Sequence, residues 1–257
     1  MFVGSAVKTF ILATCLREVE AGRLSEDEQL AIDDGVRSPS SPVFLQLSGT
    51  ASARVVLEAM IAHSDNTATD AALARVGVDR VRTFITEAGL RDVLIPDSTR
   101  RLFSWIAGAP PGTDLGWSRI TEALQGRLPG TPRPPINDQQ SMIASAAAFV
   151  GYYRQALAGR FFAQPDTLRE FKRIQAMADA IAMVVPPDTP AYAKGGSIDW
   201  QGFHALCVPG QMLQSGHPVT FCFTLNWEGP DSEVGGMMQQ YKATVAGALA
   251  AVAKEIG

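Results

Sequence analysis

The chain has 257 residues, of which 46% are hydrophobic, so it is long enough to bury a large core. Its formal net charge is −4 and it has no basic block, which argues against nucleic acid as a partner. Its three cysteines and three histidines are scattered, so we expect neither a disulfide framework nor a metal site, and no cofactor. No apolar run is long enough to cross a membrane.

The first two-thirds of the chain predict helices. An apolar run with helical spacing opens at Ser5 and ends near Gly22. A polar loop follows, and Val43 to Leu47 is expected to form a short extended piece. Apolar spacing and glycine stops then predict helices over 51–62, 67–76, 78–88, 142–157 and 167–183.

A segment rich in proline and glycine interrupts this helical pattern over residues 96–138. Short helices are expected around 100–107 and 117–124. Long irregular excursions inside compact domains are usually functional or mobile. We therefore expect this segment to be functional or mobile.

The last third changes period. Alternating patterns predict strands over 191–197, 203–209 and 218–226, followed by a closing helix over 234–256. Helices, then an antiparallel meander, then a helix define an α+β fold with helices packed on an antiparallel sheet. We expect a single domain over 1–257. Its helical part would cover about 20–185, and its sheet part about 186–257 plus the N-terminal helix.

The chemistry begins at Ser5 and Lys8, which are three residues apart at a helix start. On a helix these positions share a face, so the Lys8 amine is expected to reach the Ser5 hydroxyl. A serine hydroxyl becomes a good nucleophile when a base takes its proton. A lysine can be that base if burial or another cation lowers its pKa. Alone, the pattern S-x-x-K is also typical of an ordinary helix start.

Two further motifs change this interpretation. Ser64-Asp65-Asn66 lies in a turn after a helix, and Lys194-Gly195-Gly196 lies on the first predicted strand. S-x-x-K, S-D-N and K-T-G in this order are the signature of class A β-lactamases and penicillin-binding proteins. The chain resembles this family over most of 3–77 and 137–257. The resemblance implies a β-lactamase/DD-peptidase-like fold with one all-α part.

The resemblance also implies roles for these residues. Ser5 would attack a carbonyl and become acylated, and Lys8 would take its proton. Ser64 would relay a proton to the leaving group, while Lys194 holds that hydroxyl and supplies positive potential. Asn66 would bind the acyl chain of the substrate. The backbone N–H groups of Ser5 and Ser197 would form an oxyanion hole. Gly195 and Gly196 would let the substrate approach the backbone of the first strand.

Three departures from the family pattern limit what can be carried over. Gly195 stands where the family usually has a hydroxyl that binds a substrate carboxylate. No Glu-x-x-Leu-Asn motif for deacylation is found; Asp114 and Glu122 lie in the enlarged segment but are interpreted as solvated loop acids. Met1 lies just before Ser5, so either the start lies further upstream or two N-terminal strands of the family's sheet are missing; without them, a sheet edge would need covering.

A second resemblance is to the β-lactamase-like esterases of clavulanic acid clusters, carried by the stretches 3–9 and 98–110. The sequence therefore predicts a serine hydrolase that forms an acyl-enzyme with a small-molecule ester or β-lactam-like amide. The alternatives are a β-lactamase proper, a D-Ala-D-Ala-type peptidase, and a sensor or inactive relative that does not turn over. Lacking an export signal, the chain as written predicts a cytoplasmic location; a start further upstream would predict a periplasmic or secreted one. The oligomeric state is left open.

Overall fold

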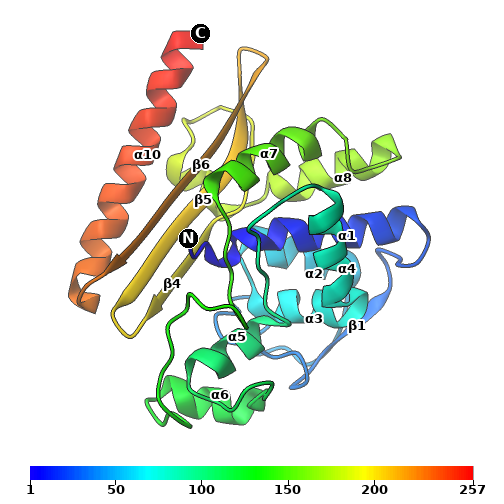
Figure 1. Cartoon of the computed structure of the whole chain (residues 1–257). Coiled ribbons are helices and arrows are strands. Elements are labelled where there is room, and N and C mark those ends of the chain that lie inside the picture. Colours follow the sequence, from blue (N-terminus) through cyan, green and yellow to red (C-terminus); the bar gives the residue numbers. More distant parts are fainter. Residues whose placement is uncertain (257) are drawn as a thin grey trace.

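The computed structural model describes residues 1–256, and its C-terminal third forms a four-stranded antiparallel sheet (Figure 1). The central strand β5 (Phe203–Gln214) pairs with β6 (His217–Glu228) along one edge. Along its other edge it pairs with β3 (Ala191–Ala193) and β4 (Gly196–Trp200). Two-residue turns join β4 to β5 and β5 to β6. Each turn has two residues at positive φ, which suits the twist of a tight hairpin.

The first predicted strand is split into β3 and β4, although both keep one continuous register against β5. The interruption falls at Lys194 and Gly195. The Lys194 N–H donates to the Pro209 carbonyl at 3.2 Å, but proline has no N–H to return the bond. The strand pairing with β5 is therefore interrupted at Lys194 and Gly195, two of the candidate site residues predicted from the sequence.

Helices cover both faces of the sheet. The long helix α10 (Val234–Ile256) runs along one face, as Figure 1 shows, and buries Val245 and Leu249. On the other face, α7 (Ala146–Leu157) packs on β5 and β6. Helix α1 (Lys8–Glu20) contacts α7 through the stacked rings of Phe10 and Phe149. It follows a short 3₁₀ helix, η1 (Gly4–Val7), and is buried for most of its length.

The helical part surrounds α1. Most of its elements agree with the expected ranges to within two residues, and they are α2 (Ala53–Ala62), α3 (Asn66–Val76), α4 (Val78–Glu87), α5 (Thr99–Ile106) and α6 (Gly116–Leu124). The helix predicted over 167–183 is wrong in one respect, since it is two helices, α8 (Pro165–Gln175) and α9 (Asp179–Val184). The helix predicted from 142 begins later, where Ser145 caps α7, because Ile143 instead forms bridges to Phe2 and Leu94.

The extended piece expected at Val43 to Leu47 is a set of turns. The backbone N–H groups of Val43 and Phe44 both donate to the Asp65 carboxylate at 2.9 Å, so no strand partner takes them. A small sheet forms on either side of this loop, from β1 (Gln29–Ile32) and β2 (Gly49–Ser52), which the sequence pattern did not predict. This arrangement places the loop against the Ser64-Asp65-Asn66 turn.

Within the described residues, β6 has β5 as its only strand partner. Near the end of β6, the Asn226 amide accepts a hydrogen bond from the Phe2 N–H and donates one to the Phe2 carbonyl, both at 2.8 Å. The first residues are thereby attached to the sheet by a side chain rather than by strand pairing. None of the helices in residues 1–256 is long and apolar enough to cross a bilayer.

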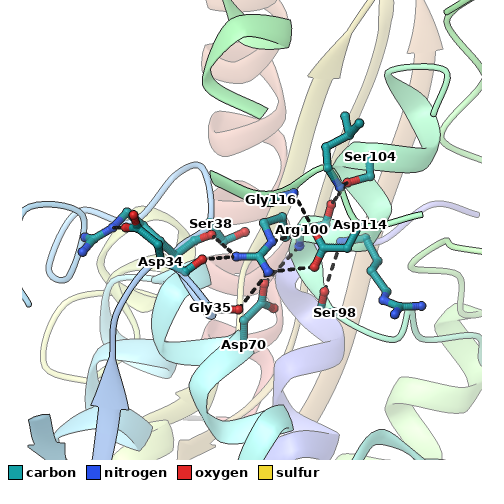
Figure 2. A network of polar contacts seen from close by, with 12 residues as sticks. Asp34, Gly35, Ser38, Asp70, Ser98, Arg100, Ser104, Asp114 and Gly116 are labelled. Atoms are coloured by element: carbon teal, nitrogen blue, oxygen red, sulfur yellow. Dashed lines mark hydrogen bonds and ion pairs between the residues drawn. The ribbon is translucent and has the colours of Figure 1, made fainter. Parts of the chain in front are cut away.

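A polar network centred on Arg100 attaches the enlarged segment to the helical part (Figure 2). The Arg100 guanidinium bonds Asp114 through two nitrogens at 2.7 Å and donates to the carbonyls of Asp34, Gly35 and Arg37. Burial alone would raise the pKa of Asp114, but the Arg100 bonds outweigh it and lower that pKa. Asp114 is therefore a structural ion-pair partner, and its interpretation as a solvated acid is wrong. Glu122 is exposed, as expected.

Candidate active site

The Lys8 side chain lies at the start of α1 and is fully buried. Its Nζ donates to the Ser64 carbonyl at 2.6 Å and to the Asn66 Oδ1 at 2.7 Å, and it lies 3.3 Å from the Ser64 Oγ. Among the described residues, Ser5 is not one of its hydrogen-bond partners. The structure thus joins the first motif to the second, but it does not show the Lys8–Ser5 hydrogen bond that helical spacing predicts.

The surroundings of Lys8 favour its neutral form. Burial, followed by the charge of Lys194, lowers the pKa of Lys8 well below its usual value, while Asp65 and Asp70 act in the opposite direction. A neutral amine has two N–H donors and one lone pair. In that form the two short bonds to the Ser64 carbonyl and Asn66 would use both donors, and the lone pair would face the third contact of Nζ, the Ser64 hydroxyl.

The turn that carries Ser64 is fixed from several sides. Ser64 has φ of 59°, a left-handed conformation that is unusual outside glycine. The next residue, Asp65, caps α3 by accepting from the Ala68 N–H at 2.8 Å, and its second oxygen holds the 43–44 backbone. Asn66 has its Nδ2 bonded to the Pro39 carbonyl at 2.7 Å. One N–H of this amide remains for a substrate.

On the sheet side, a glycine allows close contact with η1. A Cβ atom on Gly196 would lie 2.7 Å from the Ser5 nitrogen and 2.6 Å from the Ala6 nitrogen, closer than real Cβ atoms approach. The absence of a side chain therefore lets the Ser5 backbone pack against β4. Because Lys194 directs its N–H toward β5, strand alternation directs the Ser197 N–H to the open edge, toward Ser5. The oxyanion hole expected at the Ser5 and Ser197 N–H groups stays a prediction.

Gly195 packs against α9. A Cβ atom at this position would lie 2.8 Å from the Cβ of Ala180, so a threonine or serine would collide there unless α9 moved. The neighbouring Lys194 is buried and donates to the Gly195 carbonyl at 2.8 Å. Burial lowers the pKa of Lys194 to about 7, although Asp179 opposes this change. Its positive charge consequently depends on pH near neutrality.

Ser5, Ser64 and Ser197 border two cavities that meet at Ser5. The first, of about 260 Å³, is mostly apolar and adds Lys194, Gly195 and Gly196 to its lining; its far wall comes from α9 and α10 with Met183, Met238, Tyr241 and Lys242. The second, of about 580 Å³, adds Asn66. Seven of the eight candidate residues therefore line one or both cavities. The eighth, Lys8, is buried and contacts two of the others, Ser64 and Asn66.

Two acid–histidine pairs in these cavities were not found from the sequence. His63 Nδ1 lies 3.0 Å from Asp179 in the first cavity, and His204 Nδ1 lies 2.8 Å from Asp199 beside the second. Both carboxylates therefore already have a partner. His63 directly precedes Ser64, and this adjacency in the sequence could have indicated that His63 lies at the site. Asp199 and His204 face each other only through the register of the β4–β5 hairpin.

Comparisons with known proteins identify the family and the fold. The model of the Beta-lactamase enzyme family matches residues 1–205, and the chain belongs to that family. A search of curated proteins gave no match. Among solved structures, an ancestral class A β-lactamase shares 17% identity with a TM-score of 0.73, covering 99% of this chain and 85% of that one. PBP-A shares 17% identity with a TM-score of 0.68, covering 95% and 80%.

A β-lactamase from Sphaerobacter thermophilus is also similar, with 17% identity, a TM-score of 0.69, and coverage of 96% of this chain and 82% of that one. At this identity the structures show the fold, which is that of class A β-lactamases. The family match and the fold together make the protein a β-lactamase-like serine hydrolase. The resemblance inferred from the three motifs is confirmed.

Proposed function

We propose that the protein hydrolyses esters, and more slowly β-lactam-like amides, through an acyl-enzyme on Ser5. The observation that carries the proposal is the position of the buried Lys8 amine, which bonds the Ser64 carbonyl and Asn66 and lies 3.3 Å from the Ser64 hydroxyl. A neutral buried lysine is a suitable general base for a serine hydroxyl.

The first half-reaction would proceed as follows. The Ser5 Oγ attacks the substrate carbonyl as its proton passes to the Lys8 Nζ, and the N–H groups of Ser5 and Ser197 bind the developing oxyanion. The proton then passes from Lys8 through the Ser64 hydroxyl, 3.3 Å away, to the leaving oxygen as the ester bond breaks. We place the leaving group in the cavity beside Lys194 and the acyl group in the cavity beside Asn66.

Two observations support an ester over a penicillin. The Gly195 position has no hydroxyl, and Ala180 occupies the space where one would lie. In addition, no glutamate lines either cavity, and the carboxylates that do, Asp179 and Asp199, are each paired with a histidine. We therefore expect slow deacylation after reaction with a β-lactam. Lys8 would serve as the base for deacylation of an ester.

Intact-mass spectrometry with a panel of short-chain esters, one penicillin and one cephalosporin tests the proposal. We expect an adduct on Ser5, its loss in Ser5→Ala, and its retention in Ser197→Ala, which keeps the backbone N–H. Steady ester turnover supports an esterase, and a single burst supports a sensor. Fast penicillin hydrolysis would identify a β-lactamase proper, and release of D-alanine from a D-Ala-D-Ala peptide would identify a peptidase. An adduct on Ser64 or Ser197 would contradict the mechanism.

A further inference from the structure

The cavity beside Asn66 contains one feature that the acyl-transfer mechanism does not use. Of its lining residues, Asp199 is the only one with an acidic side chain, and none is a lysine or arginine. Asp199 follows Ser197 by two residues on β4, so strand alternation puts the two side chains on the same side of the strand. The carboxylate therefore lies along the path of a group that leaves the oxyanion hole and enters this cavity.

The Asp199 carboxylate is held in place by a buried histidine. His204 is directly opposite on β5, and its side chain is fully buried. One ring nitrogen lies 2.8 Å from the Asp199 Oδ1, and the other lies 2.9 Å from the Gly229 carbonyl. A carbonyl and a carboxylate both accept hydrogen bonds, so this arrangement favours the ring with both nitrogens protonated. Burial would lower the pKa of His204, but the bonds to the Gly229 carbonyl and to Asp199 outweigh it and raise that pKa.

A second carboxylate lies near the other side of this histidine. Asp231, at the start of the segment leading into α10, lies 3.9 Å from the second ring nitrogen of His204. With the ring protonated, one imidazolium lies between two carboxylates, and the three groups together carry one negative charge. The Asp199 side chain remains 53% exposed, and its Oδ2 has no hydrogen-bond partner among residues 1–256. That oxygen is available to a ligand.

The remaining walls of the cavity suit a partly apolar ligand. Phe103, from α5, and Pro42 and Leu45, from the loop before β2, line it together with Asp199. An aromatic ring beside a carboxylate favours an organic cation, because the ring face and the carboxylate both attract positive charge. By strand geometry, Asp199 lies about 7 Å along β4 from Ser197, which corresponds to an acyl chain of about five atoms.

We propose that Asp199 forms a subsite for a cationic group at the end of the substrate's acyl chain. This inference rests on the proposed function, since it assumes that an acyl group bonded to Ser5 occupies this cavity. It narrows the substrate class to esters whose acyl part carries an ammonium group several atoms from the carbonyl. His204 is a positioning residue for that carboxylate.

A pair of isosteric substrates tests the subsite. The 4-nitrophenyl esters of 5-(trimethylammonio)pentanoate and 6,6-dimethylheptanoate have the same shape and differ in one positive charge. We expect wild-type kcat/KM to favour the cationic ester by about fivefold or more, as a partly exposed ion pair with an aromatic neighbour allows. The preference should fall to about one in Asp199→Asn and persist in Asp199→Glu. It should also weaken at high salt.

The design separates the possible failures. The neutral ester is an internal reference, so a variant that folds poorly loses both activities while the ratio still reports on the subsite. Asp188→Asn removes an exposed acid outside this cavity and should leave the ratio unchanged. Turnover of both esters with no preference, or a preference that survives in Asp199→Asn, overturns the subsite and leaves the proposed function standing. Failure of both esters to acylate Ser5 overturns both.

Discussion

The cleft around Ser5 has one wall made of helices and one made of the sheet, and the two walls are held in different ways. On the helical wall, side chains determine the geometry: Lys8 bonds Ser64 and Asn66, and Asp65 bonds three backbone N–H groups. On the sheet wall, backbone pairing and the missing side chain of Gly196 determine it. The helical wall is therefore sensitive to removal of polar atoms, and the sheet wall is sensitive to addition of any atom.

The largest effect is expected from Lys8→Arg, which breaks the helical wall. Arginine keeps the charge but does not release a proton near neutral pH, so the base for Ser5 is lost. We expect ester acylation to fall by about 10²- to 10⁴-fold, the usual contribution of a general base. Stopped-flow acylation with a chromogenic ester measures it. Near-normal acylation by this variant would remove Lys8 from the mechanism.

A comparable but smaller loss is expected when one carbon is added to the sheet wall. In Gly196→Ala the new Cβ would overlap the Ser5 and Ala6 nitrogens, so η1 and β4 would separate and the two oxyanion donors would no longer converge. Loss of one such donor lowers kcat by about 10²-fold or more. Gly235→Ala is the matched control, because a Cβ there meets nothing within 4 Å. Equal activity in the two variants would show that Ser5 does not depend on contact with β4.

The pH dependence of acylation tests how Lys194, on the sheet wall, acts on Lys8, on the helical wall. Burial lowers the pKa of Lys194 to about 7, so Lys194 loses its positive charge as the pH rises through 7. The charge of Lys194 then no longer lowers the pKa of Lys8. Acylation should therefore decline as the pH rises above about 7. Lys194→Arg, which stays charged, should remove the decline and be about tenfold faster than wild type at pH 9, after normalisation at pH 6. A wild-type profile that rises to pH 9 would contradict this role.

The smallest effect on chemistry is expected at Asp114 and Glu122 of the enlarged segment, neither of which lines the two cavities. Asp114→Asn leaves the buried Arg100 without its carboxylate. Since Asp114 is itself 26% exposed, we expect a loss of about 2 kcal/mol in the free energy of unfolding, below the range for fully buried pairs. Glu122→Gln, on the exposed side, should change stability by less than about 0.5 kcal/mol. Urea unfolding measures both.

Ester turnover per folded molecule should change by less than about tenfold in either variant, or about 1.4 kcal/mol of barrier. A penicillin should be included in the same series. Its fast hydrolysis in wild type and collapse in Glu122→Gln would mean that this exposed acid is the deacylation base.

Much of this arrangement follows from local sequence. Helix starts and stops placed Ser5, Lys8 and Ser64 at the ends of helices, and the alternating pattern after residue 190 placed Lys194 on a strand. The fold class followed from the order of these elements. Such features depend on spacing within one element, where period and capping residues carry the information.

The features that were missed depend on contacts between distant elements. The need for glycine at 196 comes from its contact with Ser5, and the partners of Lys8 come from a turn more than fifty residues away. The break between β3 and β4 required the register that puts Pro209 opposite Lys194. The turns at Val43 to Leu47 arose because the Asp65 carboxylate takes their N–H groups. Local propensity contains none of this information.

The left-handed backbone of Ser64 has an evolutionary consequence. A non-glycine residue held in this conformation is strained by about 1–2 kcal/mol, and glycine at the same position would relieve the strain while deleting the hydroxyl. Ser64→Gly, which removes the hydroxyl, would then make the protein more stable. Gene copies released from selection for catalysis would accumulate glycine here, whereas a serine kept against this gradient would mark lineages in which the enzyme is still in use.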